Sequence, residues 1–213
     1  LEIAKLYDAK KVIYVSSSEV YGSAQYAPID EKHPLNAPHP YGASKIAADR
    51  MCHAYIQTYG MNISIVRPFN VFGPRQAMDD DYSVVIPKFI NCMLNEQSPP
   101  VHGSGEQSRD FTYIDNVVEA NILSATTPGI KCEVFNVACG KDQSILELVD
   151  TLNKIMAKSI KPIFTPPRPG DVFRTLADIS RIEAILGYDS KIGFEDGLKR
   201  TVEWFEAAFV KII

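Results

Sequence analysis

The sequence has little of what marks secreted, metal-binding or membrane-bound proteins. Its four cysteines, at positions 52, 92, 132 and 139, lie far apart, with the spacing of neither a zinc site nor a disulfide framework. No apolar run approaches the roughly 20 residues of a membrane-spanning helix, and the first residues do not resemble a signal peptide. We therefore expect a cytoplasmic protein with no metal site and no membrane partner.

Basic residues are also scarce. Lysine and arginine number 22 against 26 aspartates and glutamates, the formal net charge is −4, and no stretch is dense in positive charge. This balance disfavours nucleic acid as a partner, and it means that an anionic ligand would need individually placed arginines. Apolar residues make up 46% of the chain, an ordinary share for a protein with a buried core.

Helix and strand patterns alternate along the first part of the chain. Residues 1–6 place apolar side chains at helical spacing with no N-cap before them, so we expect the chain to begin inside a helix. Apolar runs at 11–16 and 62–67 predict strands buried on both faces, and residues 41–59 predict a helix closed by Gly60. This order is typical of an α/β fold with a doubly wound parallel sheet.

The pattern of predicted elements changes after Gly73. Helices are predicted near 84–94, 116–125, 144–158, 180–186 and 194–209, a strand at 134–137, and a proline-rich loop at 162–170. Ser144 and Glu147 have the spacing of a capping box at the start of one of these helices. We expect residues 74–213 to form mainly a smaller α/β lobe, with residues 110–140 returning to the sheet of residues 1–73.

Polar residues gather where the first predicted strand ends, in the segment 16–22 (SSSEVYG). In open parallel sheets, ligands bind outside the carboxyl ends of the strands. An ordinary polar strand exit would have the same composition, so this segment needs a second motif beside it.

The second motif is Tyr41 and Lys45, four residues apart at the start of a predicted helix and therefore on one helix face. A phenol is a poor base at neutral pH until a neighbouring ammonium favours its anion, and Lys45 can supply that charge. The pair alone is common on amphipathic helices. Between a serine-rich strand exit and a second buried strand, it indicates an acid/base site.

Five segments in order resemble the extended short-chain dehydrogenase/reductase family, in particular its nucleotide-sugar epimerases, dehydratases and decarboxylases. The segments are 15–22 (VSSSEVYG), 41–45 (YGASK), 67–75 (RPFNVFGPR), 109–115 (RDFTYID) and 168–171 (RPGD). The resemblance runs nearly end to end. It implies a Rossmann-like sheet, a smaller substrate-binding lobe and NAD as the cofactor.

The resemblance also assigns roles to residues. It implies that Tyr41 is the acid/base, that Lys45 holds the cofactor ribose and favours the Tyr41 anion, and that Ser17 hydrogen-bonds the sugar 4-oxygen. Ser16 and Pro68 would contact NAD beside Tyr41 and Lys45. The residues expected to contact a UDP-linked sugar are Ser17, Ser18, Asn70 (on a phosphate), Val101, His102, Arg109, Arg168, Asp171 and Thr175. The two arginines would clamp the diphosphate, since guanidinium groups match phosphate oxygens bidentately.

One feature of the family is absent from these residues: the glycine-rich loop that seats the dinucleotide pyrophosphate on a helix N-terminus. The resemblance implies a further segment of roughly a hundred residues ahead of Leu1, which would carry the early strands of the sheet. It also implies a homodimer through the helix that begins at Tyr41. Without the missing segment, a catalytically silent fragment is an alternative interpretation.

The reaction we expect is NAD-dependent epimerisation at C4 of a UDP-hexose or UDP-N-acetylhexosamine, through a 4-keto intermediate. The alternatives are a nucleotide-sugar 4,6-dehydratase and a UDP-glucuronate decarboxylase. In either of them, Glu19 would be a catalytic residue. The usual Thr-Asp-Glu triplet of dehydratases aligns with Ser17-Ser18-Glu19, so a serine stands at the acid position and disfavours dehydration. Thr175 aligns with a residue that gates the sugar pocket, and its small side chain favours an N-acetylated sugar.

Overall fold

A computed structural model describes residues 1–77, 85–167 and 172–209. Its main sheet has three parallel strands in the order β1-β2-β7: β1 (Val12–Val15), β2 (Ile63–Pro68) and β7 (Val134–Val137). Val15 pairs with Val66, which pairs in turn with Phe135. The carboxyl ends of all three strands therefore meet at one edge, as the predicted doubly wound fold requires.

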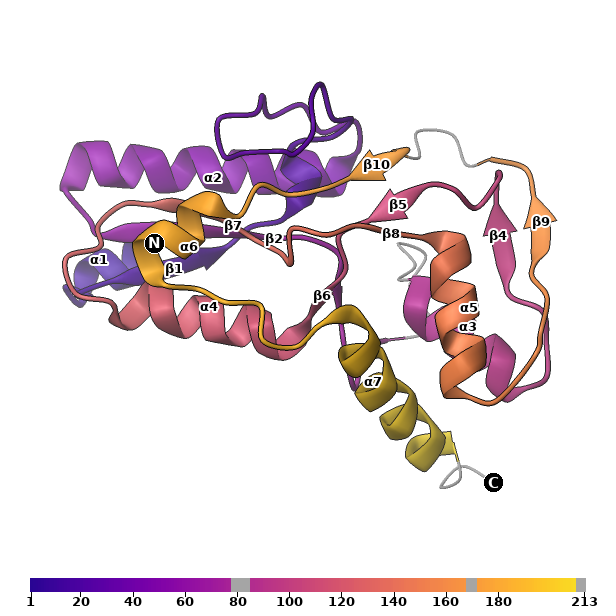
Figure 1. Ribbon diagram of the computed structural model, residues 1–213. Helices are drawn as coiled ribbons and strands as arrows, with labels where there is room; N and C mark the ends of the chain where they lie inside the picture. Colours follow the sequence, from indigo (N-terminus) through magenta and orange to yellow (C-terminus); the bar gives the residue numbers. More distant parts are fainter. Residues whose placement is uncertain (78–84, 168–171, 210–213) are drawn as a thin grey trace.

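Helices cover both faces of this sheet (Figure 1). Because side chains alternate along a strand, Ile63 and Ile65 of β2 face α2 (Pro40–Tyr59), where they pack on Cys52. Val66 faces the other way, toward α4 (Ile114–Thr126) and α6 (Ser180–Leu186). The short α1 (Glu2–Leu6) precedes β1. Burial on both faces confirms the prediction for β2, but it was wrong for β1, which lies at the edge of the described sheet and is only partly buried.

Helix α2 has a defined start and end. His39 is its N-cap in an extended conformation, Pro40 follows at the first helical position, and Gly60 ends the helix with a φ of 65°. Proline suits the first turn because its missing N–H has no intrahelical partner there, and glycine adopts the left-handed C-cap at least cost. This boundary sets the place of Tyr41 and Lys45 at the sheet's carboxyl edge.

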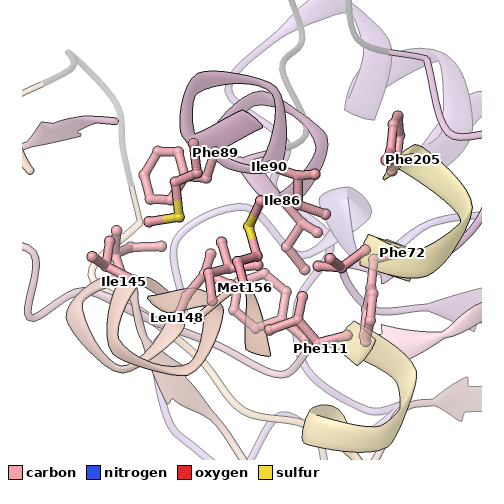
Figure 2. Packing of buried hydrophobic residues seen from close by; sticks show 14 of the residues in the cluster. Phe72, Ile86, Phe89, Ile90, Phe111, Ile145, Leu148, Met156 and Phe205 are labelled. Carbon is pink, nitrogen blue, oxygen red and sulfur yellow. The ribbon is translucent and has the colours of Figure 1, made fainter. Parts of the chain in front are cut away.

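The smaller lobe packs around one apolar core beside the carboxyl edge of the sheet. Figure 2 shows how Phe89 and Ile86 of α3 (Val85–Leu94) meet Ile145 and Leu148 of α5 (Ile145–Ile155). Helix α7 (Phe194–Phe209) contributes Phe205 to the same core. The predicted capping box at Ser144 and Glu147 is present.

Short strands complete the lobe and its joint to the sheet. They are β3 (Val71–Phe72) with β6 (Thr112–Tyr113), β5 (Ser108–Arg109) between β8 (Gln143–Ser144) and β10 (Arg174–Thr175), and β4 (Pro100–His102) with β9 (Ile163–Thr165). The prediction of a loop over 162–170 was wrong at β9. Three β-favouring residues between prolines are enough for a strand when β4 offers them a parallel partner.

Asp110 ties the sheet to the lobe. Its carboxylate is fully buried and accepts the backbone N–H groups of Cys139, Gly140 and Ala177, which come from segments after β7 and β10. Burial raises the pKa of Asp110 to about 7, against the opposing effect of the three N–H donors. One side chain thus joins its own segment to two others beside the cavity described below.

In the part of the chain that the structure describes, no helix has the length and apolar character needed to cross a membrane.

Candidate active site

A cavity of about 750 Å³ lies where the carboxyl edge of the sheet meets the lobe. One end is polar and contains the strand exit after β1 together with Tyr41 and Lys45. The other end is formed by β4 and α3 and is mainly apolar. The cavity also reaches Asn70, Arg109 and Thr175, so it brings together predicted site residues from five separate segments of the sequence.

Serines form the polar end of the cavity. Ser17 is the N-cap of the 3₁₀ helix η1 (Ser18–Val20), and its Oγ accepts the backbone N–H of Glu19 at 3.2 Å. Because that contact uses the oxygen as an acceptor, the hydroxyl hydrogen of Ser17 stays available for a ligand oxygen. Ser16 is buried, and its Oγ has no hydrogen-bond partner among the described residues.

Tyr41 and Lys45 lie together, as their spacing predicts. The Lys45 Nζ is 5.7 Å from the centre of the Tyr41 ring, and it donates to the Val15 carbonyl oxygen at 3.0 Å. The second contact anchors the ammonium at the end of β1, beside the serines.

Glu19 also lines the cavity and has a partner behind it. Its Oε2 lies 2.8 Å from Nε2 of His39, and the Nδ1 of the same ring accepts the Gly42 N–H at 3.1 Å. The His39 ring stacks on Tyr41 with 6.4 Å between ring centres and 20° between planes. His39 is a residue that sequence reasoning missed.

Asn70 and Thr175 meet in the cavity wall. The Asn70 amide donates to Thr175 Oγ1 at 3.1 Å and to the Asp110 carbonyl oxygen at 3.3 Å. Both of its hydrogens are thus directed at protein oxygens. A phosphate contact from Asn70, as predicted, would have to come from its backbone or from a rearranged side chain.

Arg109 lines the cavity from β5, directly paired with Thr175 of β10. It is half-buried, and its guanidinium donates to the Ser108 carbonyl oxygen at 2.8 Å. Arg168 and Asp171, the other predicted contacts of the diphosphate and ribose, lie outside the described residues.

At the apolar end, Val101 is fully buried and His102 lines the cavity beside it. The Thr165 hydroxyl and His102 Nδ1 are 2.8 Å apart, so β9 holds the ring of the neighbouring strand. Ser18 and Pro68, for which contacts with the sugar and with NAD are predicted, also line the cavity.

Lys88 was not predicted as a site residue, yet it lines the cavity from α3. The amphipathic pattern of α3 indicated only a core helix, and a single lysine within it gave no signal. Among the described residues, no group of three or more histidine, cysteine, aspartate or glutamate side chains could hold a metal ion.

Comparison with known proteins gives the same family along the whole chain. The family model "NAD dependent epimerase/dehydratase family" matches residues 1–138. A protein of Methanocaldococcus jannaschii named putative UDP-glucose 4-epimerase is 37% identical over 207 residues, which cover 97% of this chain and 66% of that protein. The chain therefore spans slightly less than two thirds of this relative's length.

Two solved structures are similar in both sequence and fold. The UDP-N-acetylglucosamine 4-epimerase from Methanobrevibacter ruminantium M1, in complex with UDP-N-acetylmuramic acid, has a TM-score of 0.90 and 39% identity, covering 96% of this chain and 66% of that one. The UDP-glucuronic acid 4-epimerase from Bacillus cereus, in complex with UDP-glucuronic acid and NAD, has a TM-score of 0.90 and 32% identity, covering 97% and 65%. The predicted fold class is thereby confirmed.

Proposed function

Because the chain belongs to the NAD-dependent epimerase/dehydratase family, we propose that it carries the acid/base set and sugar cavity of an NAD-dependent UDP-sugar 4-epimerase. The observation that carries this proposal is the single cavity that holds Ser17, Tyr41 and Lys45 at one end and Arg109 and Val101 farther along. The 4-epimerase names of the similar proteins support the same reaction.

NAD, when bound, would supply the hydride acceptor and donor that reversible oxidation at sugar C4 requires. Ser16, Tyr41, Lys45 and Pro68 would hold it at the polar end. The buried Ser16 Oγ, which has no partner among the described residues, fits this role because a buried hydroxyl without a hydrogen bond is unfavourable. The residues present at this end are thus consistent with the cofactor.

The protein's own groups handle the proton of the sugar 4-hydroxyl. As the phenolate, Tyr41 takes this proton while C4 is oxidised, stays a neutral phenol while the sugar is the 4-ketone, and gives the proton back when C4 is reduced; the Lys45 ammonium lies beside the phenolate before and after these two steps. Ser17 donates its free hydroxyl hydrogen to the same sugar oxygen. Inversion at C4 then requires only that the keto sugar turn over while the nucleotide stays bound.

The far end of the cavity would keep the nucleotide in place during that turn. Arg109 supplies a guanidinium for the diphosphate, with Arg168 as its proposed partner, since each matches phosphate oxygens as a bidentate donor. Val101 and His102, with Asp171, would contact the base and ribose. With the diphosphate and the nucleoside both held, the sugar is the only part of the substrate that moves.

The sugar is proposed to be a UDP-hexose or a UDP-N-acetylhexosamine. Thr175 lies in the cavity wall with its hydroxyl held by Asn70, and its small side chain leaves room that a large aromatic residue would fill. This favours acceptance of an N-acetyl group.

A 4,6-dehydratase reaction, with loss of water across C5 and C6, and decarboxylation of UDP-glucuronate are alternatives. Both would assign a chemical role to Glu19, which lines the cavity. Ser18 at the acid position of the dehydratase triplet counts against the first. A catalytically silent fragment is the remaining alternative, and NAD titration tests it, because a folded chain without NAD affinity would support it.

We also propose that the protein forms a homodimer through α2 in the cytoplasm. Met51 and Tyr59 of this helix are half exposed, which suits an apolar interface, and all four cysteines are free thiols, which suits a reducing compartment. Sedimentation velocity tests the dimer directly, and a monomer at all concentrations would contradict it.

The decisive experiment is NMR of the protein incubated with catalytic NAD and, separately, UDP-GlcNAc, UDP-glucose and UDP-glucuronate. Formation of the C4 epimer supports the proposal. A 4-keto-6-deoxy sugar or a pentose product would show that the protein is a lyase and not an epimerase. Unchanged substrates, despite measurable NAD binding, would refute turnover.

A further inference from the structure

A chain of three consecutive hydrogen bonds connects Ser17 to the first turn of α2. Ser17 Oγ accepts the Glu19 N–H, Glu19 Oε2 faces Nε2 of His39, and His39 Nδ1 accepts the Gly42 N–H, with lengths of 3.2, 2.8 and 3.1 Å. Ser17 follows β1, whereas Tyr41 belongs to α2. This chain of contacts therefore spans the gap between the two groups proposed to act on the sugar 4-oxygen.

The contacts fix the tautomer of the His39 ring. A neutral imidazole carries one N–H and one bare nitrogen. Because Nδ1 accepts the Gly42 N–H, Nδ1 must be bare, and the ring proton must lie on Nε2. The ring therefore donates this proton to the Glu19 carboxylate, and each end of His39 has a single direction of hydrogen bonding.

We propose that Glu19 and His39 are positioning residues that set Tyr41 relative to Ser17, and that Glu19 does not act as the base of an elimination. The inference rests on the proposed function, because it explains how two groups on separate elements are held at one sugar oxygen. It also selects among the reactions above, since dehydration and decarboxylation both need Glu19 for chemistry.

Packing around the ring supports a positioning role. Glu19 and Tyr41 both line the cavity, while His39 is not among the described residues that line it. The two groups that face its ring are the Glu19 carboxylate on η1 and the Tyr41 phenol on α2. A Cβ at Gly42 would lie 2.7 Å from the Glu19 carbonyl oxygen, so η1 and the start of α2 are already in close contact. His39 packs beside this contact between η1 and α2.

The effect should appear in the rate rather than in the stability. The side chains of Glu19 and His39 are 48% and 35% exposed, and contacts of this kind between partly exposed groups contribute little to folding. A displacement of about 1 Å in a reacting group, by contrast, can cost about 100-fold in rate. The two readouts thus separate positioning from bulk stabilisation.

Glu19 variants separate a positioning acceptor from a base. Glu19→Gln keeps an oxygen that accepts from His39 Nε2, so we expect kcat close to that of the unmodified protein, whereas Glu19→Ala should lower kcat about tenfold with little change in KM. A catalytic base predicts a loss of about 10²–10⁴-fold in both variants. Equal large losses would overturn the proposal.

His39 variants separate the two ends of the ring. Asparagine at 39 can place its oxygen near the position of Nδ1 and cap α2, but it is too short to reach Glu19, whereas glutamine can reach Glu19 without capping. We expect His39→Asn to keep the melting temperature and still lose about tenfold in kcat. Unchanged kcat in His39→Asn would show that the cap alone suffices and would contradict the link through Glu19.

A spectroscopic measurement tests the link without turnover. Long-range ¹H–¹⁵N correlation spectra of the protein at neutral pH should show His39 with a protonated Nε2 and a bare Nδ1, and Glu19→Ala should weaken this preference. The opposite tautomer would overturn the inference. Because this readout needs no substrate, it remains decisive for the Glu19–His39 link even where no epimer forms and the proposed function itself fails.

Discussion

The side-chain amide of Asn70 donates to Thr175 Oγ1 at 3.1 Å, and this contact joins the segment after β2 to strand β10 across the cavity wall. Thr175 also pairs directly with Arg109 in the β5–β10 ladder. The residue proposed to decide which sugar enters is thus held by main-chain pairing on one side and by a side-chain hydrogen bond on the other.

Thr175→Tyr should select against acetylated sugars. The larger ring would fill the space proposed for the N-acetyl group, so we expect kcat/KM for UDP-GlcNAc to fall at least about tenfold more than that for UDP-glucose. Thr175→Val, which has nearly the same volume, is the matched control and should leave the ratio of the two substrates unchanged. An equal loss on both sugars in the tyrosine variant would contradict the assignment.

Asp110 should make stability depend on pH in a defined direction. Its pKa is about 7 in the fold, above the value of about 3.9 in an unfolded chain, because burial disfavours the charged form. The folded state therefore holds this proton more tightly than the unfolded state does. Asp110 therefore contributes most to the free energy of unfolding below about pH 3.9, and this contribution is lost in the window from about pH 3.9 to about pH 7.

The test compares urea unfolding of the unmodified protein and Asp110→Asn between about pH 4 and about pH 8. Asparagine cannot titrate, so the difference in unfolding free energy between the two proteins should change with pH inside the window and become constant above it. A difference that stays constant over the whole range would show that Asp110 keeps one charge state throughout.

Gly42→Ala should separate η1 from α2. The added Cβ would lie 2.5 Å from the Ala37 Cβ and 2.7 Å from the Glu19 carbonyl oxygen, and neither neighbour is the end of a flexible side chain. We expect a loss of roughly 1–3 kcal/mol in unfolding free energy, together with lower kcat. Gly193→Ala meets nothing within 4 Å and serves as the control, and equal effects in both variants would count against this close contact.

Much of the fold could be predicted from the sequence because its main elements carry local signals. Residues 62–67 carry a mainly apolar strand pattern, Gly60 marks the end of α2, and Ser144 with Glu147 marks the start of α5. Strand β9 was missed because it exists only through pairing with β4. A strand that is three residues long gives too little pattern of its own.

The site, too, combines residues that have a local sequence signal with contacts that arise only from tertiary packing. Tyr41 and Lys45 could be singled out because their spacing places them on one helix face, and Ser17 because the family resemblance assigns it a role; all three line the cavity. The Glu19–His39 contact joins residues 20 positions apart, and the buried Arg67–Asp49 ion pair joins residues 18 apart, so both depend on how η1, β2 and α2 pack. No local period encodes contacts of that kind.

Lys88 is the cation that sequence reasoning did not assign to the cavity. It lies on α3 one turn after Val85, which also lines the cavity, and has no hydrogen bond or ion pair with another described residue. A half-buried lysine that lines the cavity and has no carboxylate partner among the described residues is available to an anionic ligand. A diphosphate is the anion that the proposed substrate provides.

Lys88→Gln should therefore weaken UDP binding. Loss of one charge-assisted hydrogen bond costs about 1.5–3 kcal/mol, so we expect the Kd for UDP, measured by calorimetry at low salt, to rise at least about tenfold. The difference should shrink as salt is raised, because screening weakens the charge that the variant lacks. Lys161→Gln makes the same change in net charge at an exposed position that is not among the described cavity residues, and it should leave the Kd unchanged. Similar losses in both variants would mean that Lys88 acts only through net charge and does not contact the ligand.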